Sequence, residues 1–366
     1  MRLTRLKTEN FRNLAAVDVT PAPGVNVIYG ENAQGKTNLL ESVYMLAMGR
    51  SFRTRFDKEL IGFGCDSAEI LADVVSHERE QTVRILLRSG VRKQITVNSV
   101  KKTASELGET LNVVLFCPDD LNLIKEGAAA RRRLMDNAIS QIRPRYAEYL
   151  SQFNKFYESK TRILKDWREK PSLLDTLDEF SDGMCRTSAQ LIRYRASFAA
   201  RLADEAAPIH SEFSGADEKL GIEYSTVSAV KDPTASAKEI FYDLCDHMEA
   251  HRRAELDSGQ CLSGAHKDDL IISINGKNAR SFASQGQTRT AALSIKLAER
   301  EIYLDETGES PILLLDDVLS ELDTKRQEFV LNRIGGGQTL ITCCEDEGIS
   351  RRTGGKVLHV GNGRIG

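Results

Sequence analysis

Residues 30–37 read Gly30-Glu31-Asn32-Ala33-Gln34-Gly35-Lys36-Thr37, which matches the phosphate-loop pattern Gly-x-x-x-x-Gly-Lys-Ser/Thr. A short apolar strand from Asn26 to Tyr29 precedes the loop, and apolar residues at helical spacing follow from Leu39 to Ala47. This order places backbone N–H groups and the positive end of a helix around a phosphate. Lys36 would contact the β- and γ-phosphates, and the Thr37 hydroxyl would bind Mg²⁺. The sequence therefore predicts that the chain binds and hydrolyses ATP.

A second part of this site is expected after the apolar run Ile312-Leu313-Leu314-Leu315, which is typical of a strand buried in a parallel sheet. Asp316 ends that run and would supply the carboxylate for Mg²⁺. Asp317 would face the other way and orient or deprotonate the attacking water, or else it caps the next turn. The acidic segment Ser320 to Asp323 is either a helix cap or a contact across a dimer.

Ser284 and Gly286 form a second candidate anion site, directly before a periodic helix from Thr288 to Tyr303. One ATP needs only one phosphate loop, so this second site would serve the nucleotide of another subunit. The alternative is that Ser284, with Gln287 three residues on, is an ordinary helix cap. Its place shortly before the apolar strand and Asp316 favours the nucleotide role.

The pattern of apolar residues predicts an α/β protein in which a helical lobe interrupts an ATPase domain. Alternating runs between 69 and 97 predict an antiparallel accessory sheet, whereas 118–208 has helical periodicity. Because parts of the nucleotide site lie on both sides of the lobe, we expect ATPase parts at 1–117 and 209–366. Further strands are expected at 2–9, 221–227, 270–274, 339–343 and 357–360, and a further helix at 237–256.

Composition restricts the class of protein. The 366 residues are 41% hydrophobic and 28% charged, as in a globular protein of about two domains. No stretch approaches the roughly 20 apolar residues of a membrane span, and residues 1–7 lack a signal-peptide block, so we expect a cytoplasmic protein. The seven cysteines lack Cys-x-x-Cys spacing, which predicts reduced thiols. A net charge of −3 predicts that any DNA binding is local.

The chain resembles the RecF family, bacterial recombination mediator ATPases related to SMC heads and ABC ATPases, over nearly its full length. The resemblance rests on the phosphate loop, on Leu315-Asp316-Asp317 with Ser320 to Asp323, and on six further motifs. These are Asn10-Phe11-Arg12-Asn13, Gly49-Arg50-Ser51-Phe52-Arg53-Thr54, Phe116-Cys117-Pro118-Asp119-Asp120-Leu121, Arg131-Arg132-Arg133, Gly264-Ala265-His266-Lys267-Asp268-Asp269 and Ser284-Gln285-Gly286-Gln287. It implies an ABC/SMC-type ATPase head with a mixed P-loop sheet.

The resemblance also implies a homodimer that ATP holds together, with each site shared between two subunits. One subunit contributes phosphate-loop residues and the other contributes the signature, and Lys36 and Asp317 act in catalysis with Mg²⁺ on Thr37 and Asp316. Arg12 matches in position residues that contact nucleotide in related heads, although an exposed arginine there needs no role. The implied nucleotide-binding residues are Arg12, Gly30, Asn32, Gly35, Lys36, Thr37, Asn38, Ser284, Gly286 and Gln287.

The family implies a role in DNA replication, repair and recombination, including the SOS response. Its dimer engages gapped DNA at junctions of double and single strands, and works with RecR and RecO to load RecA. Asp317 stands where most ABC ATPases have Glu, and 340–345 contains no switch histidine, which predicts slow hydrolysis. The resemblance implies that DNA stimulates this hydrolysis. Arg131, Arg132, Arg133, Arg143 and Arg145 either contact DNA phosphates or lie on a solvated helix face.

Two other classes remain open from the sequence. A transport ATPase subunit shares the loop and signature, but the inserted lobe disfavours it. A non-catalytic ATP sensor is the other possibility, and it would release negligible phosphate. The lobe is too short for the long coiled coil of a chromosome-bridging protein, and His266 is expected to be a core histidine without a metal or catalytic role.

Overall fold

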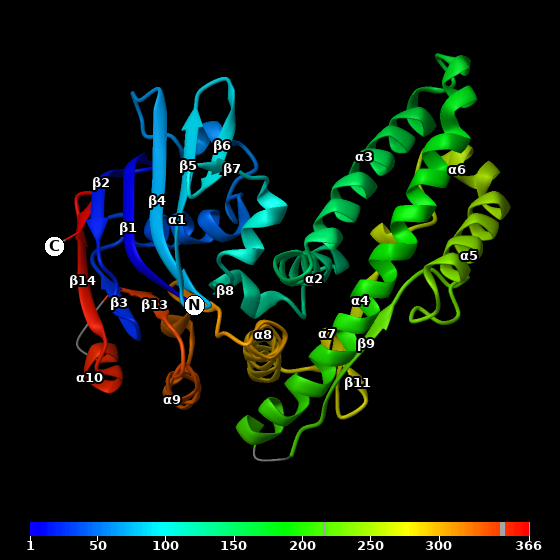
Figure 1. Ribbon diagram of the computed structural model, residues 1–366. Coiled ribbons are helices and arrows are strands. Elements are labelled where there is room, and N and C mark those ends of the chain that lie inside the picture. The colour runs from blue at the N-terminus through cyan, green and yellow to red at the C-terminus, as the bar shows by residue number, and fades with distance from the viewer. Residues whose placement is uncertain (215–216, 345–347, 366) are drawn as a thin grey trace. The chain divides into compact units, whose positions relative to one another are not determined.

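The computed structural model describes residues 1–214, 217–344 and 348–365. The chain forms two compact units (Figure 1): unit 1 contains residues 1–122 and 289–366, and unit 2 contains residues 123–288. The sequence-based boundary at 208 differs from this division. Residue 208 lies inside the long helix Leu177–Ser214, and the strand Leu220–Ser225 packs against that helix, so residues up to 288 stay with the helices.

An antiparallel sheet forms one layer of unit 1, with the strand order β2-β1-β4-β5-β6-β7. The predicted meander is present, and β4 alternates strictly between buried and half-buried residues. The sheet is larger than predicted because β2 was missed and β1 joins its edge. Its strands are β1 (Arg2–Phe11), β2 (Leu14–Val19), β4 (Ser67–Ser76), β5 (Arg79–Arg88), β6 (Val91–Val97) and β7 (Val100–Lys101).

The second sheet of unit 1 has the order β15-β14-β3-β13-β12-β8 and is parallel except at β15. The predicted strands 312–315 and 339–343 are confirmed and entirely buried, whereas β8 was not predicted. The strands are β3 (Val25–Tyr29), β8 (Val113–Phe116), β12 (Ile312–Leu315), β13 (Thr339–Cys343), β14 (Lys356–Gly361) and β15 (Arg364–Ile365). This mixed sheet carries the candidate site.

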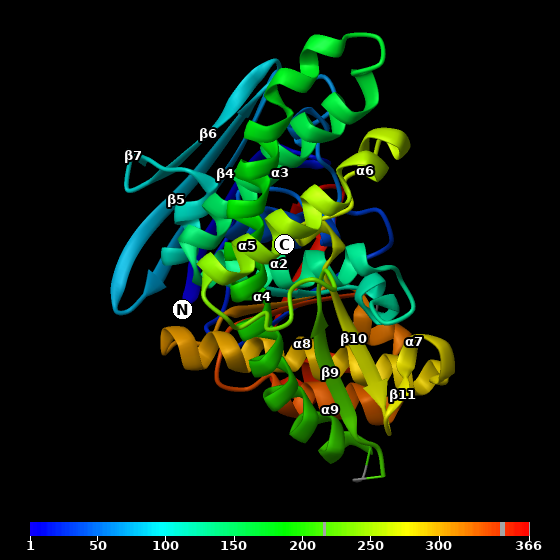
Figure 2. The same ribbon diagram turned by 90° about the vertical axis from the view of Figure 1, so that its right-hand side faces the viewer.

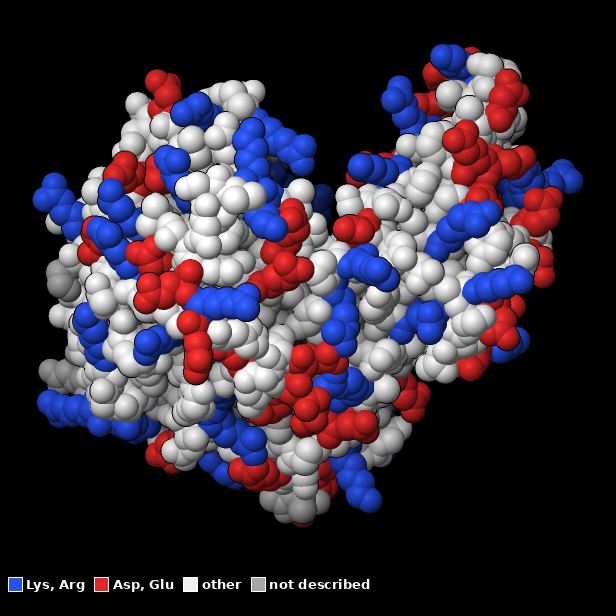
Figure 3. All heavy atoms as spheres, in the orientation of Figure 1, with Lys and Arg blue, Asp and Glu red and all other residues white. Residues whose placement is uncertain are grey.

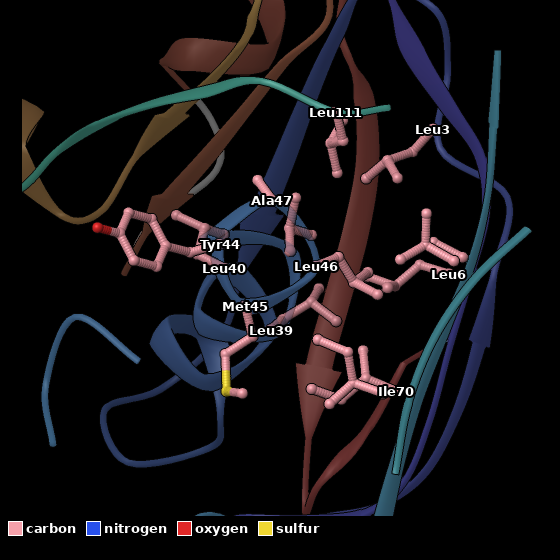
Figure 4. Close-up of a cluster of buried hydrophobic side chains, with 14 of the residues drawn as sticks. Leu3, Leu6, Leu39, Leu40, Tyr44, Met45, Leu46, Ala47, Ile70 and Leu111 are labelled. Carbon is pink, nitrogen blue, oxygen red and sulfur yellow. The ribbon is translucent and has the colours of Figure 1, made fainter. Parts of the chain in front are cut away.

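Helix α1 (Lys36–Met48) packs between the two sheets and is buried on all sides from Leu39 onward. Figure 4 shows its leucines with Leu3 and Leu6 of β1 and Ile70 of β4. A helix that is apolar all round belongs inside a core, and this one starts directly at the phosphate loop. The other helical segments of unit 1 are η1 (Asp57–Leu60), η2 (Ala104–Glu109), η3 (Pro118–Asn122), η6 (Val318–Glu321), α9 (Thr324–Arg333) and α10 (Ile349–Thr353).

Unit 2 is built on the long helices α3 (Pro144–Asp166) and α4 (Leu177–Ser214), which pack against each other, and its helical character confirms the predicted lobe. The remaining helical segments are α2 (Ala128–Ile142), η4 (Pro171–Thr176), α5 (Ala237–Ala250), α6 (Arg252–Ser258), η5 (Ala265–Lys267) and α7 (Ala279–Phe282). The single helix expected at 237–256 is wrong, because the chain breaks at His251 between α5 and α6.

The strands expected at 221–227 and 270–274 fall in the expected ATPase part 209–366, but they join neither sheet of unit 1. β9 (Leu220–Ser225), β10 (Asp269–Ile274) and β11 (Lys277–Asn278) form a separate three-stranded antiparallel sheet, and β9 lies along α4 (Figure 2). β9 and β10 each bury one face on helices of unit 2, and a short apolar run does not distinguish this burial from burial in a larger sheet. Helix α8 (Gln285–Thr307) begins in unit 2 and continues into unit 1.

The face shown in Figure 3 carries basic and acidic side chains interspersed, as the small net charge predicts. Within the described ranges, none of the helices combines the length and apolarity that crossing a bilayer requires. All seven cysteines lie in these ranges as free thiols, and three of them are buried, in agreement with the expectation of reduced thiols.

Candidate nucleotide-binding site

Strand register brings the predicted site residues of unit 1 to one edge of the parallel sheet. Tyr29 of β3 pairs with Cys343 of β13, and Leu315 of β12 pairs with Ile341 of β13. Because these strands are parallel, the residues that follow them leave the sheet on the same side. Gly30 and Asp316 therefore share one edge, which is where open α/β sheets bind ligands.

Two glycines give the phosphate loop a shape that other residues would prevent. Gly35 has φ 116° at the start of α1, where a Cβ would lie 2.7 Å from Asn13 Oδ1. At Gly30, with φ 155°, a Cβ would lie 2.2 Å from the Val360 carbonyl oxygen of the neighbouring strand. The loop between them exposes residues 31–33 to solvent at the positive end of α1. This is the arrangement an incoming phosphate needs.

Lys36 lies inside the loop with only 7% of its surface exposed. Its ammonium donates to the carbonyl of Gly30 and, over 3.2 Å, to that of Glu31. The Cys344 thiol lies 3.6 Å from the same Nζ and 3.1 Å from Asn32 Oδ1. Sequence reasoning missed Cys344, although its place directly after the strand that pairs with β3 could have revealed it.

The hydroxyl of Thr37 donates to Asp316 Oδ1 over 2.9 Å. Thr342, on the intervening strand β13, donates to the same oxygen over 3.0 Å. Burial raises the pKa of the Asp316 carboxyl group. The two hydroxyl hydrogen bonds act in the opposite direction, because they stabilise the carboxylate. A bound cation would favour the carboxylate further.

The Thr37 and Asp316 oxygens fit a hard cation. Adjacent ligands of an octahedral Mg²⁺, each about 2.1 Å from the metal, are about 3 Å apart. Across the described residues, His, Cys, Asp and Glu nowhere gather in the threes that an all-protein metal cage needs. Mg²⁺ held with phosphates needs only one or two carboxylates, so Thr37 and Asp316 match that type of site.

Asp317 leaves the strand in an unexpected way. Its backbone is left-handed, with φ 53°, so strand alternation does not set the direction of its side chain. Its N–H donates to the Thr342 hydroxyl over 2.8 Å, and its carbonyl accepts from Ser320. Asp317 is the N-cap residue of η6, but its side chain accepts no hydrogen bond from a backbone N–H of that helix. Asp323 does cap α9 by accepting from the Arg326 N–H, which confirms the cap interpretation for that residue.

Arg12 is anchored to α1. Its guanidinium makes two hydrogen bonds, of 2.9 and 3.0 Å, to the carboxylate of Glu41, which is fully buried. Ser51 and Arg53 contact the same carboxylate. Glu41 thus ties the Asn10–Asn13 and Gly49–Thr54 motifs to the helix of the phosphate loop, and sequence reasoning missed it.

Asn38 supports the loop through its side chain. Its amide donates to Asn13 Oδ1 over 2.7 Å, and its own oxygen accepts from Arg53 over 2.7 Å. Asn13 in turn donates to the carbonyl of Ala33 in the loop. The three side chains form a chain of hydrogen bonds along the outside of the loop.

The second candidate anion site lies in unit 2. Ser284 and Gln287 form a reciprocal helix cap, in which the Gln287 N–H donates to the Ser284 hydroxyl and the Ser284 N–H donates to Gln287 Oε1. The cap interpretation is therefore correct as geometry. Ser284 is exposed, whereas Gly286 and Gln287 are half-buried.

Two further motifs of unit 2 have structural roles. Arg131 is 4% exposed and pairs through two hydrogen bonds with Asp269, so the expected choice between DNA contact and solvated face does not apply to it. Arg132 donates to the Asp268 carbonyl. His266 is half-buried beside Tyr157, and its Nε2 lies 2.9 Å from the Cys261 carbonyl oxygen. Its neighbours among the described residues are the aromatic rings of Phe153 and Tyr157 and a backbone carbonyl, as expected of a core histidine.

The fold and the phosphate loop define an ATPase head of the SMC class. The family described as RecF/RecN/SMC N terminal domain matches residues 2–354. The chain is 38% identical over 362 residues to the DNA replication and repair protein RecF of Acetivibrio thermocellus, covering 98% of each. It is 42% identical over 363 residues to the RecF protein of Listeria welshimeri, covering 96% of this chain and 95% of that one. The chain belongs to the RecF family.

Solved structures agree with this family assignment. The chain matches the recombination mediator protein RecF with ATPrS in the RecFOR pathway at a TM-score of 0.92 and 34% identity, over 100% of this chain and 97% of that one. It also matches the Smc head domain of Pyrococcus furiosus bound to the C-terminal domain of ScpA at a TM-score of 0.57 and 16% identity, over 99% and 94%. The second likeness shows the fold alone.

Proposed function

We propose that this protein binds Mg²⁺-ATP and that the nucleotide joins two copies of the chain. The observation that carries this proposal is the Thr37–Asp316 contact beside the buried Lys36, because it joins the hydroxyl, carboxylate and ammonium that a nucleoside triphosphate needs. Ser284, Gly286 and Gln287 of the second copy would complete the site. A structure of RecF with ATP, 34% identical over the whole of this chain, supports the nucleotide.

Each residue of the site then has a defined task. Gly30, Asn32 and Gly35 shape the loop, Lys36 neutralises phosphate charge, and Arg12 and Asn38 hold the surrounding chain in place. Bound Mg²⁺ would neutralise the charge that develops on the phosphates. Thr37 and Asp316 would hold that ion, while Asp317 would orient and deprotonate water. Aspartate reaches less far than glutamate by about one methylene, so hydrolysis would be slow and would time the separation of the two copies.

We also propose that the ATP-bound dimer acts in the cytoplasm on gapped DNA, at junctions of double and single strands. With RecO and RecR it would help to load RecA, and DNA would stimulate its hydrolysis. The support is membership of the family of DNA replication and repair proteins RecF, and likeness to a recombination mediator of the RecFOR pathway.

Size-exclusion chromatography with ATP and with ADP tests the dimer. We expect a dimer with ATP only, and a monomer under both conditions would disprove the proposal. Ser284→Arg should retain ATP binding and lose dimerisation, whereas Lys36→Ala should lose ATP binding itself. Ser258→Arg is the matched control, because Ser258 is an exposed serine on α6 outside the candidate site.

Binding to gapped, duplex and single-stranded DNA, with ATP, a non-hydrolysable analogue and ADP, tests the coupling. The measurement needs several salt concentrations, because phosphate contacts depend strongly on salt. ATP-independent binding would contradict the coupling. Equal, negligible phosphate release from the wild type and Asp317→Asn, with DNA present, would indicate an ATP sensor instead.

A further inference from the structure

The amide group of Gln287 is engaged on both sides within unit 2. Its Oε1 accepts from the Ser284 N–H over 2.9 Å, and its Nε2 donates to Glu218 Oε1 over 2.7 Å. The carbonyl oxygen that a nucleotide-binding glutamine would offer therefore already accepts one hydrogen bond, from the helix cap. Ser284 differs, because its hydroxyl oxygen accepts from Gln287 while its hydroxyl proton can still be donated.

Glu218 connects this cap to the interior of unit 2. The residue lies just before β9, with 22% of its side chain exposed. Its Oε2 lies 3.2 Å from Nε2 of His210, a completely buried residue of α4. Burial lowers the pKa of His210, so its ring is neutral near pH 7 and Nε2–H donates to the carboxylate. One carboxylate thus joins a buried histidine to the glutamine.

The strand pairing holds Glu218 in register with the segment that leads to Ser284. The Lys219 N–H donates to Asn275 Oδ1, and the Asn275 N–H donates back to the Lys219 carbonyl. On the other side, the Lys125 ammonium donates to the carbonyls of Arg280 and Ala283, directly before Ser284. The start of α8 is therefore fixed from two directions.

We propose that Glu218 is a positioning residue for the signature: it fixes the side chain of Gln287, which through the cap holds the Ser284 hydroxyl for the nucleotide of a second copy. Gln287 then acts by shaping the start of α8, and Ser284 is the group that touches phosphate. This inference rests on the proposed ATP-joined dimer. It adds two residues, Glu218 and His210, that do not contact nucleotide.

Glu218→Ala tests the first step in the ATP-free monomer. Hydrogen exchange, followed by mass spectrometry on peptides that contain 284–287, should become faster because the cap loses its anchor. Glu223→Ala is the matched control, since Glu223 is an exposed glutamate on β9, the strand that begins two residues after Glu218. Unchanged exchange in the Glu218 variant would overturn the inference whether or not the protein dimerises.

The second step is tested by separating ATP affinity from dimerisation. Glu218→Ala should leave the affinity of the monomer for ATP unchanged, because Lys36 and the loop are intact, but weaken ATP-dependent dimerisation about tenfold. Glu218→Gln, which keeps an acceptor for Gln287, should recover part of the loss. A wild type that dimerises with ATP, beside an equally dimeric Glu218→Ala, would overturn the inference alone; a wild type that stays monomeric would overturn the proposed dimer with it.

A double-mutant cycle with Gln287→Ala gives the sharpest test. If Glu218 acts only through Gln287, the double variant should dimerise no more weakly than Gln287→Ala alone. Additive losses would show that Glu218 acts by another route and would overturn the inference. Circular dichroism checks that each variant folds. If Glu218→Ala unfolds, Glu218→Gln and Gln287→Met take its place. Gln287→Met must then weaken dimerisation by the same factor of about ten, with the ATP affinity of the monomer unchanged.

Discussion

The Thr37 hydroxyl donates to Asp316 Oδ1 across 2.9 Å, although 279 positions separate the two residues in the chain. Thr342 joins the same oxygen from β13, the strand between those that carry the loop and the carboxylate. Three oxygen atoms from three separate segments thus meet at one point, and the Thr342 hydroxyl also holds the backbone of Asp317.

Thr342→Val should lower ATP hydrolysis roughly tenfold, because it removes a hydrogen bond to Asp316 and leaves the Asp317 N–H without its acceptor. Phosphate release at saturating Mg²⁺-ATP measures the effect. Thr339→Val is the control, since Thr339 is buried on the same strand and its hydroxyl has no hydrogen-bond partner among the described residues. That variant should keep full activity; a similar loss in both would mean that packing of β13, and not the hydroxyl, matters.

Arg12→Ala should destabilise the protein by about 3 kcal/mol, because it leaves the buried Glu41 with weaker partners. Urea unfolding measures the change, and the double variant Arg12→Ala/Glu41→Ala should lose less than the sum of the single variants. Arg5→Ala removes a comparable but exposed pair with Asp18, from strand β1, which ends directly before Arg12. Its loss should be much smaller, because an exposed ion pair contributes little to stability. Equal losses at Arg12 and Arg5 would contradict a buried anchor.

The stability of the wild type should fall as the pH drops from about 6.5 towards 4, in part because of His266. Burial lowers the pKa of His266 from 6.5 to about 4, and its Nδ1 has no hydrogen-bond partner among the described residues. The unfolded chain therefore binds a proton that the folded chain refuses within this window.

His266→Gln should reduce the slope of unfolding free energy against pH in that window by up to about 1.4 kcal/mol per pH unit. Denaturant unfolding at a series of pH values measures the slope. His359→Gln is the control, because His359 is an exposed histidine on β14. An unchanged slope in the His266 variant would contradict the prediction, because it would show that burial does not lower the pKa of His266 in the folded protein.

Mg²⁺-ATP should slow alkylation of Cys344 by iodoacetamide, because the exposed thiol lies 3.6 Å from the Lys36 ammonium. Mass spectrometry of each cysteine follows the rate, and half-buried Cys65, between η1 and β4, serves as the internal control. Protection should disappear in Lys36→Ala. Equal rates at Cys344 with and without nucleotide would place the phosphates elsewhere.

The local pattern of the chain predicted the elements next to the motifs well. The strand at 312–315 is a continuous apolar run and the helix after the phosphate loop has helical periodicity, and both are where they were predicted. Strand β2 was missed because its residues Ala15 and Ala16 weaken the alternation, and β9 was assigned to the wrong sheet. Periodicity reports which face is buried, but not which element covers it.

The site was predicted in part for the same reason. A motif names residues that are close in sequence, such as Lys36 and Thr37, and Asp316 followed from its place at a strand end. Thr342, Cys344 and Glu41 belong to no motif of this kind. They reach the site only through the pairing of β13 with its neighbours and through the burial of α1, which depend on the folded chain.

Strand β3 has β13 on one side and β14 on the other, so its partners are made more than 300 residues later. Contacts so distant in sequence form late, and chains fold during synthesis from the N-terminus at about 5–20 residues per second. At Gly30 the loop lies close to the Val360 carbonyl, since a Cβ there would come within 2.2 Å of that oxygen, so this side of the loop is complete only after residue 360 has been made. We therefore expect that a nascent chain of the first three hundred residues does not bind nucleotide on the ribosome. Nucleotide binding would begin only when the last strands have been made and have paired with β3.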